Sequence, residues 1–197
     1  MSIMAKAKTI AIASTILAGL CACSSAPEQA DAFHRITGRG TALGQTENLR
    51  TKLFVHRPSV EAAVAQRAIA FRTEDGTIRH RRRELWADSP EVLIGERIAE
   101  RLAAKGIRKS SAGEETEVNL RIRVSEFEET PGGNGTAALS YVLERTSDGK
   151  VLAEGRRSAT IQARGESAAE IAAAIGTAAD AVIDAAIDAI IPSMKPM

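Results

Sequence analysis

The stretch Val118-Asn-Leu-Arg-Ile-Arg-Val-Ser125 decides the fold of this chain. Its apolar residues alternate with polar ones, which is the period of a β-strand that has one buried and one solvated face. The alternation returns in two further segments, 139–143 and 151–163. The turn sequences at 131–135 and 148–149 separate the three segments. The sequence therefore predicts three successive strands in an antiparallel meander.

An alanine-rich segment near the C-terminus is predicted to form a long helix over about 167–191. Ser167 and Glu170 have the spacing of a capping box, and Pro192 ends the segment. A helix that lies across a sheet needs a broad apolar stripe. Such a stripe is expected from Ile171, Ile175, Val182, Ala186 and Ile190.

A second helix is predicted over about 89–105, with Gly106 at its end. At its start, Asp88-Ser89-Pro90 offers a capping side chain and a proline at the first helical position. Arg97, Arg101 and other charged residues are expected mainly on faces away from the apolar one. That apolar face is formed by Ile94, Ile98 and Leu102.

The N-terminal half is predicted to add strands to the same sheet. Segments 68–71 and 77–80 flank Asp75-Gly76, a dipeptide favoured in hairpin turns. Shorter candidate strands lie at 33–36 and 49–55. The fold class predicted is therefore α+β, a single domain in which a largely antiparallel sheet packs against the mid-chain and C-terminal helices.

The first 22 residues have the pattern of a secretion signal. Lys6 and Lys8 form a basic region, and an uncharged, mostly apolar segment follows at 9–20. This segment is too short to be a transmembrane helix, which needs roughly 20 apolar residues for a hydrocarbon core of ~30 Å.

The tetrapeptide Leu20-Cys21-Ala22-Cys23 is similar to a bacterial lipobox, in which Cys23 is the residue that receives acyl chains such as palmitate. The alternative is an ordinary secretory signal cut near Ala22 or Ala26, with Cys23 incidental. On the lipobox interpretation, residues 1–22 are a signal peptide, 23–32 a small and polar tether, and 33–197 the folded domain.

Composition narrows the function classes. Two of the 26 basic residues, Lys6 and Lys8, lie in the signal, which leaves 24 against 25 acidic residues and a net charge of −1. This balance does not favour a nucleic-acid partner, which requires a basic domain. Both cysteines, Cys21 and Cys23, lie at the processing site, so an intramolecular disulfide in the mature domain is excluded.

No catalytic or metal motif is present in the sequence. The three histidines, His34, His56 and His80, lie on or beside predicted strands, and no serine occupies a G-x-S-x-G elbow. They are interpreted as surface histidines. The chain lacks H-x-x-x-H and acidic calcium-loop patterns, so no metal or cofactor is expected.

The run Arg79-His-Arg-Arg-Arg83 is the main charge cluster, and Trp86 follows it. One interpretation makes Arg79, Arg81, Arg82, Arg83 and Trp86 a docking surface for anionic lipid head groups or an acidic partner. The other makes the arginines the protection of an exposed edge strand, with Trp86 as a packing anchor between helix and sheet. The second interpretation is favoured.

Residues 65–106 carry a family resemblance. They contain Gln66-Arg67-Ala-Ile-Ala-Phe71, a hairpin, Glu84-Leu-Trp86-Ala-Asp88-Ser-Pro and a helix with Arg-Leu near its end. This arrangement resembles the ABC-type transport auxiliary lipoproteins, which accompany lipid-transport systems of the MCE type, including the paraquat-inducible one. The lipobox, the meander and the terminal helix occur in the family's order, so the resemblance covers essentially the whole mature chain.

Two positions depart from the family pattern. The Arg-Trp-Ala-Asp/Glu signature stands here as Leu85-Trp86-Ala87-Asp88, without the preceding basic residue, and Phe33 stands where the family often has tyrosine.

The resemblance implies a non-enzymatic periplasmic lipoprotein without a known active site. It implies attachment through Cys23 to the inner face of the outer membrane, and work with MCE proteins and an inner-membrane ABC transporter. Ser24 is not the aspartate that retains many enterobacterial lipoproteins in the inner membrane. A homo-oligomer is compatible with the resemblance. The alternative class is an envelope-assembly or secretion accessory lipoprotein without a transport role.

Overall fold

The computed structural model describes residues 30–36, 51–111 and 113–194. The predicted signal peptide, Cys23 and most of the tether lie outside these residues. The elements follow in the order β1 (Ala32–His34), β2 (Leu53–Val55), β3 (Ser59–Val60), β4 (Ala68–Arg72), β5 (Ile78–Trp86), α1 (Pro90–Ala104), β6 (Val118–Thr130), β7 (Asn134–Arg145), β8 (Val151–Gln162), α2 (Ala168–Ile190) and the short 3-10 helix η1 (Ile191–Met194).

The predicted meander is confirmed. β6 pairs with β7 and β7 with β8, both antiparallel, along almost their whole length. In the β6–β7 register Leu120 lies opposite Leu143 and Val124 opposite Leu139, so the alternating apolar residues share one face. A shift in register between Val124 and Glu126 lets Phe127 point to that face as well.

The other edge of β6 is lined by three short strands in succession. β2, β3 and β4 all run parallel to β6, at Val118–Leu120, at Arg123–Val124 and at Glu128–Glu129 of its length. Val60 ends β3, and the segment 61–66 that follows it continues as a turn.

The predicted hairpin around Asp75-Gly76 is confirmed as β4 and β5. β1 pairs in parallel with the last three residues of β5, so the order of the path is β1-β5-β4-β6-β7-β8. Within the described residues β5 has β4 as its neighbour along the arginine run and gains β1 only at Glu84–Trp86.

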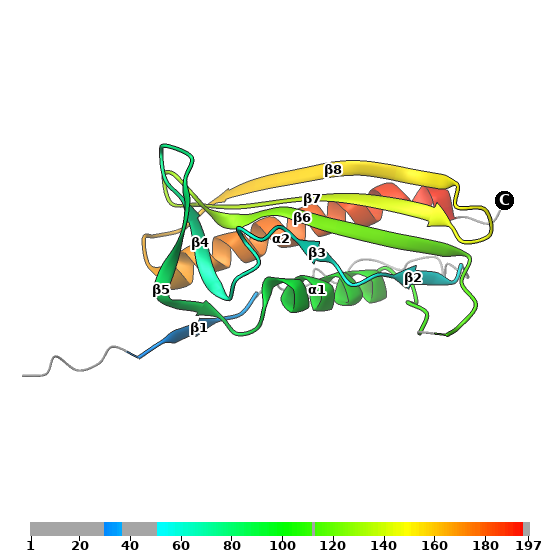
Figure 1. Cartoon of the computed structure of the whole chain (residues 1–197), viewed down its shortest axis with the longest axis horizontal. Helices are drawn as coiled ribbons and strands as arrows, with labels where there is room; N and C mark the ends of the chain where they lie inside the picture. Colours follow the sequence, from blue (N-terminus) through cyan, green and yellow to red (C-terminus); the bar gives the residue numbers. More distant parts are fainter. Residues whose placement is uncertain (1–29, 37–50, 112, 195–197) are drawn as a thin grey trace, which may run out of the picture.

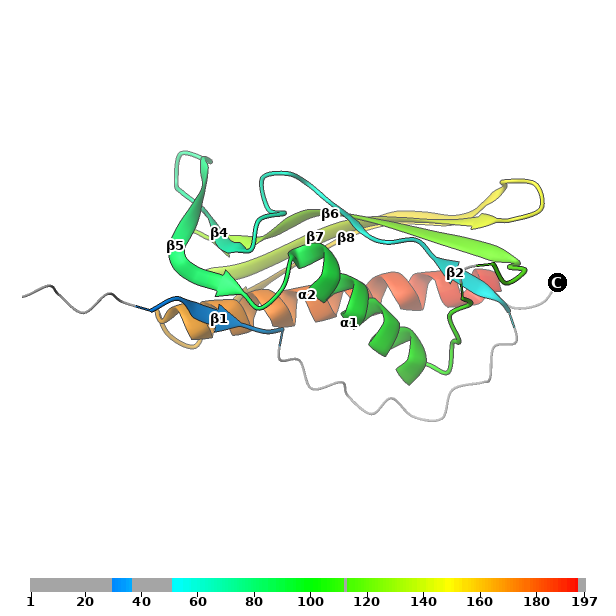
Figure 2. The same cartoon turned by 60° about the horizontal axis from the view of Figure 1, so that its bottom comes forward.

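Both predicted helices are confirmed and lie on the same face of the sheet (Figures 1 and 2). The capping box of Ser167 and Glu170 forms at the start of α2. At the end of α1, Ile107 N donates to Leu102 O and Gly106 N to Ala103 O, which is a Schellman motif around a glycine at φ +71°. At the start of α1 the Ser89 side chain makes no capping hydrogen bond.

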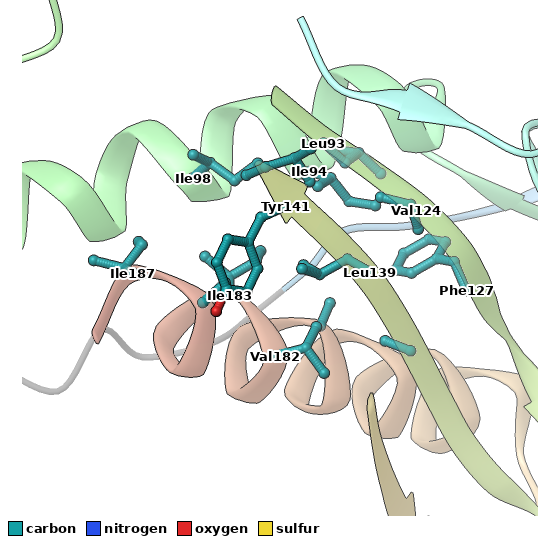
Figure 3. Packing of buried hydrophobic residues seen from close by; sticks show 14 of the residues in the cluster. Leu93, Ile94, Ile98, Val124, Phe127, Leu139, Tyr141, Val182, Ile183 and Ile187 are labelled. Carbon is teal, nitrogen blue, oxygen red and sulfur yellow. The ribbon is translucent and has the colours of Figure 1, made fainter. Parts of the chain in front are cut away.

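The core lies between the meander and the two helices. Figure 3 shows Ile94 and Ile98 of α1, Leu139 and Tyr141 of β7 and Ile183 of α2 converging on one apolar layer. All five residues of the predicted α2 stripe are buried, as are the three of the predicted α1 face. Burial of this aliphatic layer is the main source of stability that the sequence offers to a domain without disulfides.

Candidate docking surface

The β4–β5 hairpin, which carries the arginine run, projects at the end of the molecule where β6 turns into β7 (Figure 1). Its turn is closed by hydrogen bonds: Thr73 N donates to Thr77 O, and Asp75 Oδ1 accepts from Thr77 N at 3.0 Å. Hydrogen bonds from the Thr73 side chain and from Thr77 lower the pKa of Asp75 to about 2. Gly76 supplies the positive φ of +84° that the turn requires.

The arginines of β5 do not form one uniform surface. Arg79, Arg82 and Arg83 are exposed, whereas Arg81 is half-buried. Arg81 donates to Glu129 at 2.7 Å, and its guanidinium carbon lies 5.9 Å from the centre of the Phe71 ring. Three of the four arginines of the candidate docking surface are therefore exposed, while the fourth ties the hairpin to β6.

A second ion pair fixes the hairpin from the β4 side. Arg72 donates from Nε to Glu128 Oε1 at 2.9 Å, and Glu128 is fully buried. The second carboxylate oxygen of Glu128 has no hydrogen-bond partner. A buried carboxylate depends strongly on its cation, so this pair holds the hairpin in place against the end of β6.

Trp86 is only 1% exposed and cannot contact a partner. Its ring packs on Phe127 with a centroid distance of 4.8 Å and an angle of 34°. Its carbonyl oxygen accepts two hydrogen bonds from the Arg67 guanidinium, at 3.2 and 3.3 Å. The structure therefore places Trp86 in the core against Phe127 of β6, and not on the exposed face of the hairpin. The reason is that β5 turns its last residue into the core just before α1 begins.

The three histidines are separate and serve structural contacts. His34 Nε2 lies 2.6 Å from Glu84 Oε2, and His80 Nε2 lies 2.9 Å from the carbonyl oxygen of Ala63. His56 packs edge-on against Phe54, and its Nε2 is buried without a partner. All three are partly buried rather than freely exposed, and in the part of the chain described here none hydrogen-bonds to a serine or threonine hydroxyl.

A buried ion-pair ladder between the helices was missed from the sequence. Arg97 and Arg101 are 9% and 4% exposed, and both donate to Asp180. Lys105 continues the ladder to Asp188 one turn further on. The expectation that the arginines lie away from the buried face is wrong. The signal was present as three basic residues spaced by four on one helix and three acidic residues spaced by four on the other.

The charged groups of this ladder are not equally well compensated by their partners. The hydrogen bonds that Arg97 donates to Asp180 raise the pKa of Arg97. Asp184 lies between the other two aspartates, and its Oδ1 is buried without a hydrogen-bond partner. Burial raises the pKa of the Asp184 carboxyl even though Arg101 and Lys105 act in the opposite direction. The ladder therefore holds the two helices in register, and Asp184 is the member whose buried charge is least compensated.

Fold and surface together define an α+β domain with an arginine-bearing hairpin at one end. In residues 30–36, 51–111 and 113–194 it presents no group of side chains suited to hold a metal ion and no helix long and apolar enough to cross a membrane. A family model described as the ABC-type transport auxiliary lipoprotein component matches residues 38–186. The chain belongs to this family, as the motifs around Trp86 suggested. A lipoprotein family implies a place in the cell envelope, and this one is a family of transport auxiliary proteins rather than of enzymes.

Solved structures share the fold. A Xanthomonas campestris protein of the DUF330 family, which is the same family, is 20% identical, with a TM-score of 0.74 over 82% of this chain and 96% of that one. An uncharacterised protein is 14% identical, with a TM-score of 0.63 over 81% and 99%. A hypothetical protein of Chlamydia trachomatis is 11% identical, with a TM-score of 0.50 over 74% and 98%. No protein of curated function matches the sequence.

Proposed function

We propose that this chain is a non-enzymatic lipoprotein subunit of an MCE-type, ABC-driven intermembrane lipid transport system, and that it docks the assembly at the outer membrane. The observation that carries the proposal is the family match over 38–186 combined with the lipobox that ends at Cys23. The first supplies the link to an ABC transporter, and the second supplies the link to a membrane.

The proposal assigns a role to each part of the chain. Residues 1–22 direct export, acyl chains on Cys23 anchor the mature protein, residues 23–32 are the tether, and 33–197 form the docking domain. Several acyl chains hold a protein at a bilayer far more firmly than the single chain that gives only marginal binding. The domain then acts in the periplasm, within a fixed distance of the lipid surface.

The exposed arginines of β5 are the proposed contact surface for an acidic partner. Arg79, Arg82 and Arg83 are held on a hairpin that two ion pairs attach to the sheet, so their positions are defined before a partner arrives. Preorganised charge favours fast and specific association more than it adds affinity. The near-neutral mature chain gives no support to a nucleic-acid partner.

Crosslinking in cells followed by purification of the detergent-solubilised protein tests the function. MCE-domain and ABC-transporter components should be recovered with the natural chain. Recovery should fall with Arg79→Glu and Arg82→Glu on the hairpin. It should be unchanged with Arg121→Glu and Arg123→Glu, which lie on the exposed side of β6.

Two results would contradict the transport role. Absence of MCE and ABC components from crosslinked material is the first. Recovery of pilus or secretion components in their place is the second, and it would favour the envelope-assembly class of lipoprotein.

A further inference from the structure

Phe33 on β1 is an exposed aromatic side chain at the end of the molecule where the described chain begins. It is 59% exposed, and Val151 is the one other large hydrophobic residue so exposed among the residues described. A single exposed apolar residue is common in soluble proteins and needs no explanation by itself. The surroundings of Phe33 make it informative.

Phe33 lies in a row of side chains that crosses three strands. The pairings of β1 with β5 and of β5 with β4 place Phe33 beside Leu85, and Leu85 beside Ala68. The guanidinium carbon of Arg67 lies 5.6 Å from the centre of the Phe33 ring. Arg35 is also exposed, two residues further along the chain. We call Phe33, Arg35, Arg67 and Leu85 the β1 patch.

Charged side chains of both signs surround this patch, and the cationic ones lie closest to the Phe33 ring. Arg35 and Arg67 belong to it, and the exposed Arg83 precedes Leu85 by two residues on β5. Asp31 and Asp88 are the exposed carboxylates nearest to it in the chain, whereas Glu84 is engaged with His34. An aromatic ring among arginines has an apolar body with a cationic rim, the combination that suits the head-group region of a bilayer.

The β1 patch includes the strand of the described domain that follows Cys23 most closely along the chain. Phe33 is ten positions after Cys23, a length of chain that spans at most about 33–36 Å when fully extended. The opposite end of the domain lies further from β1 by the length of α2, whose 23 residues extend for about 35 Å. Ile36 contacts Gly176 in the first half of α2, so this helix leads away from the tethered end towards the C-terminus (Figure 1).

We propose that the β1 patch rests on the surface of the membrane in which Cys23 is anchored, with the Phe33 ring among the head groups and the arginines on lipid phosphates. This inference depends on the acylation that the proposed function assigns to Cys23. It orients the domain, with β1 at the membrane and the β7–β8 turn directed into the periplasm.

Spin labels on the acylated protein in vesicles test this orientation. Because the mature chain has no cysteine other than Cys23, whose thiol is blocked by lipid, one new cysteine can be labelled selectively. Gln66→Cys places a label beside Arg67, and Ser147→Cys places one at the exposed β7–β8 turn. In vesicles with about one third phosphatidylglycerol, the label at 66 should be protected from a water-soluble relaxation agent at least threefold more than the label at 147.

Matched substitutions identify the residues responsible. Phe33→Ser with Arg35→Ser should reduce the protection of the label at 66 at least threefold. Val151→Ser with Lys150→Ser removes an exposed apolar residue and a cation at the other end, and should leave the protection unchanged.

The outcomes separate this inference from the proposed function. Protein that floats with the vesicles but exposes the two labels equally would overturn the inference and leave the anchor intact. Protection that rises with protein density rather than with phosphatidylglycerol would indicate a second copy of the chain and would also overturn it. Protein that does not float lacks the anchor, which overturns both.

Discussion

Gly135 is a position where α2 packs very closely on the sheet. A Cβ atom at this residue would lie 2.2 Å from the nitrogen of Ile175 and 2.3 Å from the carbonyl carbon of Ala174, both in the backbone of α2. Backbone of a packed helix cannot move aside as a flexible side chain can. The sequence indicates only a turn at Gly135, because the close approach of two segments that are distant in the chain leaves no local sequence pattern.

Gly135→Ala should therefore lower the free energy of unfolding by about 1–3 kcal/mol, the usual range for overpacking. Denaturant unfolding followed by circular dichroism measures it. Gly95→Ala in α1 is the matched control, since a Cβ atom at Gly95 would meet Pro58 at an ordinary 3.5 Å. That control should be stabilised by about 0.5–1 kcal/mol through helix propensity. Equal effects of the two substitutions would contradict the close packing of α2.

Asp184 supplies a prediction with a defined pH dependence. Burial raises the pKa of its carboxyl in the folded state, so the ionised form at pH 7 lowers stability relative to the neutral form. Asp184→Asn should therefore raise the free energy of unfolding at pH 7. This advantage should shrink as the pH falls through the raised pKa, because the natural carboxyl then becomes neutral as well.

Asp75 has a pKa shift in the opposite direction and serves as a comparison. Its folded-state pKa of about 2 lies below the usual 3.8, so its contribution to stability is present above pH 3.8 and is lost as the pH falls towards 2. Asp75→Asn should lower the midpoint of denaturation at pH 7, by an amount that decreases over that acid range. Urea unfolding at a series of pH values measures both variants, and shifts of the same sign would contradict the assignment.

At the scale of elements, α1 and α2 are coupled by charge as well as by apolar packing. Asp180 is buried and accepts from Arg97 at 2.6 and 2.8 Å, and it also pairs with Arg101 at 3.0 Å. Removing one partner of a buried pair leaves an uncompensated charge, whereas removing one partner of a pair at the surface costs little.

Asp180→Ala should consequently lower the free energy of unfolding by about 3–5 kcal/mol, measured by denaturant titration. Asp188→Ala at the exposed end of the same ladder should cost less than about 1 kcal/mol. A difference of under 1 kcal/mol between these two variants would be inconsistent with a ladder that is buried at one end and exposed at the other.

Local signals predicted the elements well where they were complete within a few residues. Alternation located β6, β7 and β8, and the capping box located the start of α2 within one residue. The parallel pairing of β2, β3 and β4 with β6 could not be predicted, because such short strands carry too few alternating residues to specify a partner. The spacing by four of the basic residues and of the acidic residues is the one sequence signal that Arg97 and Arg101 face α2, and it does not by itself specify which helix faces meet.

The sequence located the residues of the candidate surface, but it did not predict which of their side chains are buried. Arg79, Arg82 and Arg83 are exposed as expected, whereas Arg81 is engaged with Glu129 and Trp86 with Phe127. Both partners lie on β6, more than 40 residues away in sequence. Exposure of Phe33 was also beyond the sequence, because β1 is too short to show which of its faces is buried.

At the scale of the whole molecule, the domain has one end near its tether and another end directed away from it. The hairpin, β1 and the start of α2 form the first end, and the β7–β8 turn and η1 form the second (Figures 1 and 2). If Cys23 is acylated, this polarity becomes an orientation relative to the membrane. The proposed docking function and the proposed membrane contact of the β1 patch both depend on that one modification.

Intact mass spectrometry of the protein purified from membranes tests this dependence most directly. We expect a single mature species of residues 23–197 whose excess mass corresponds to a diacylglyceryl group and an amide-linked acyl chain on Cys23. Cys23→Ser should abolish the excess mass and the processing together. An unmodified chain that begins elsewhere, for example after Ala26, would contradict the account.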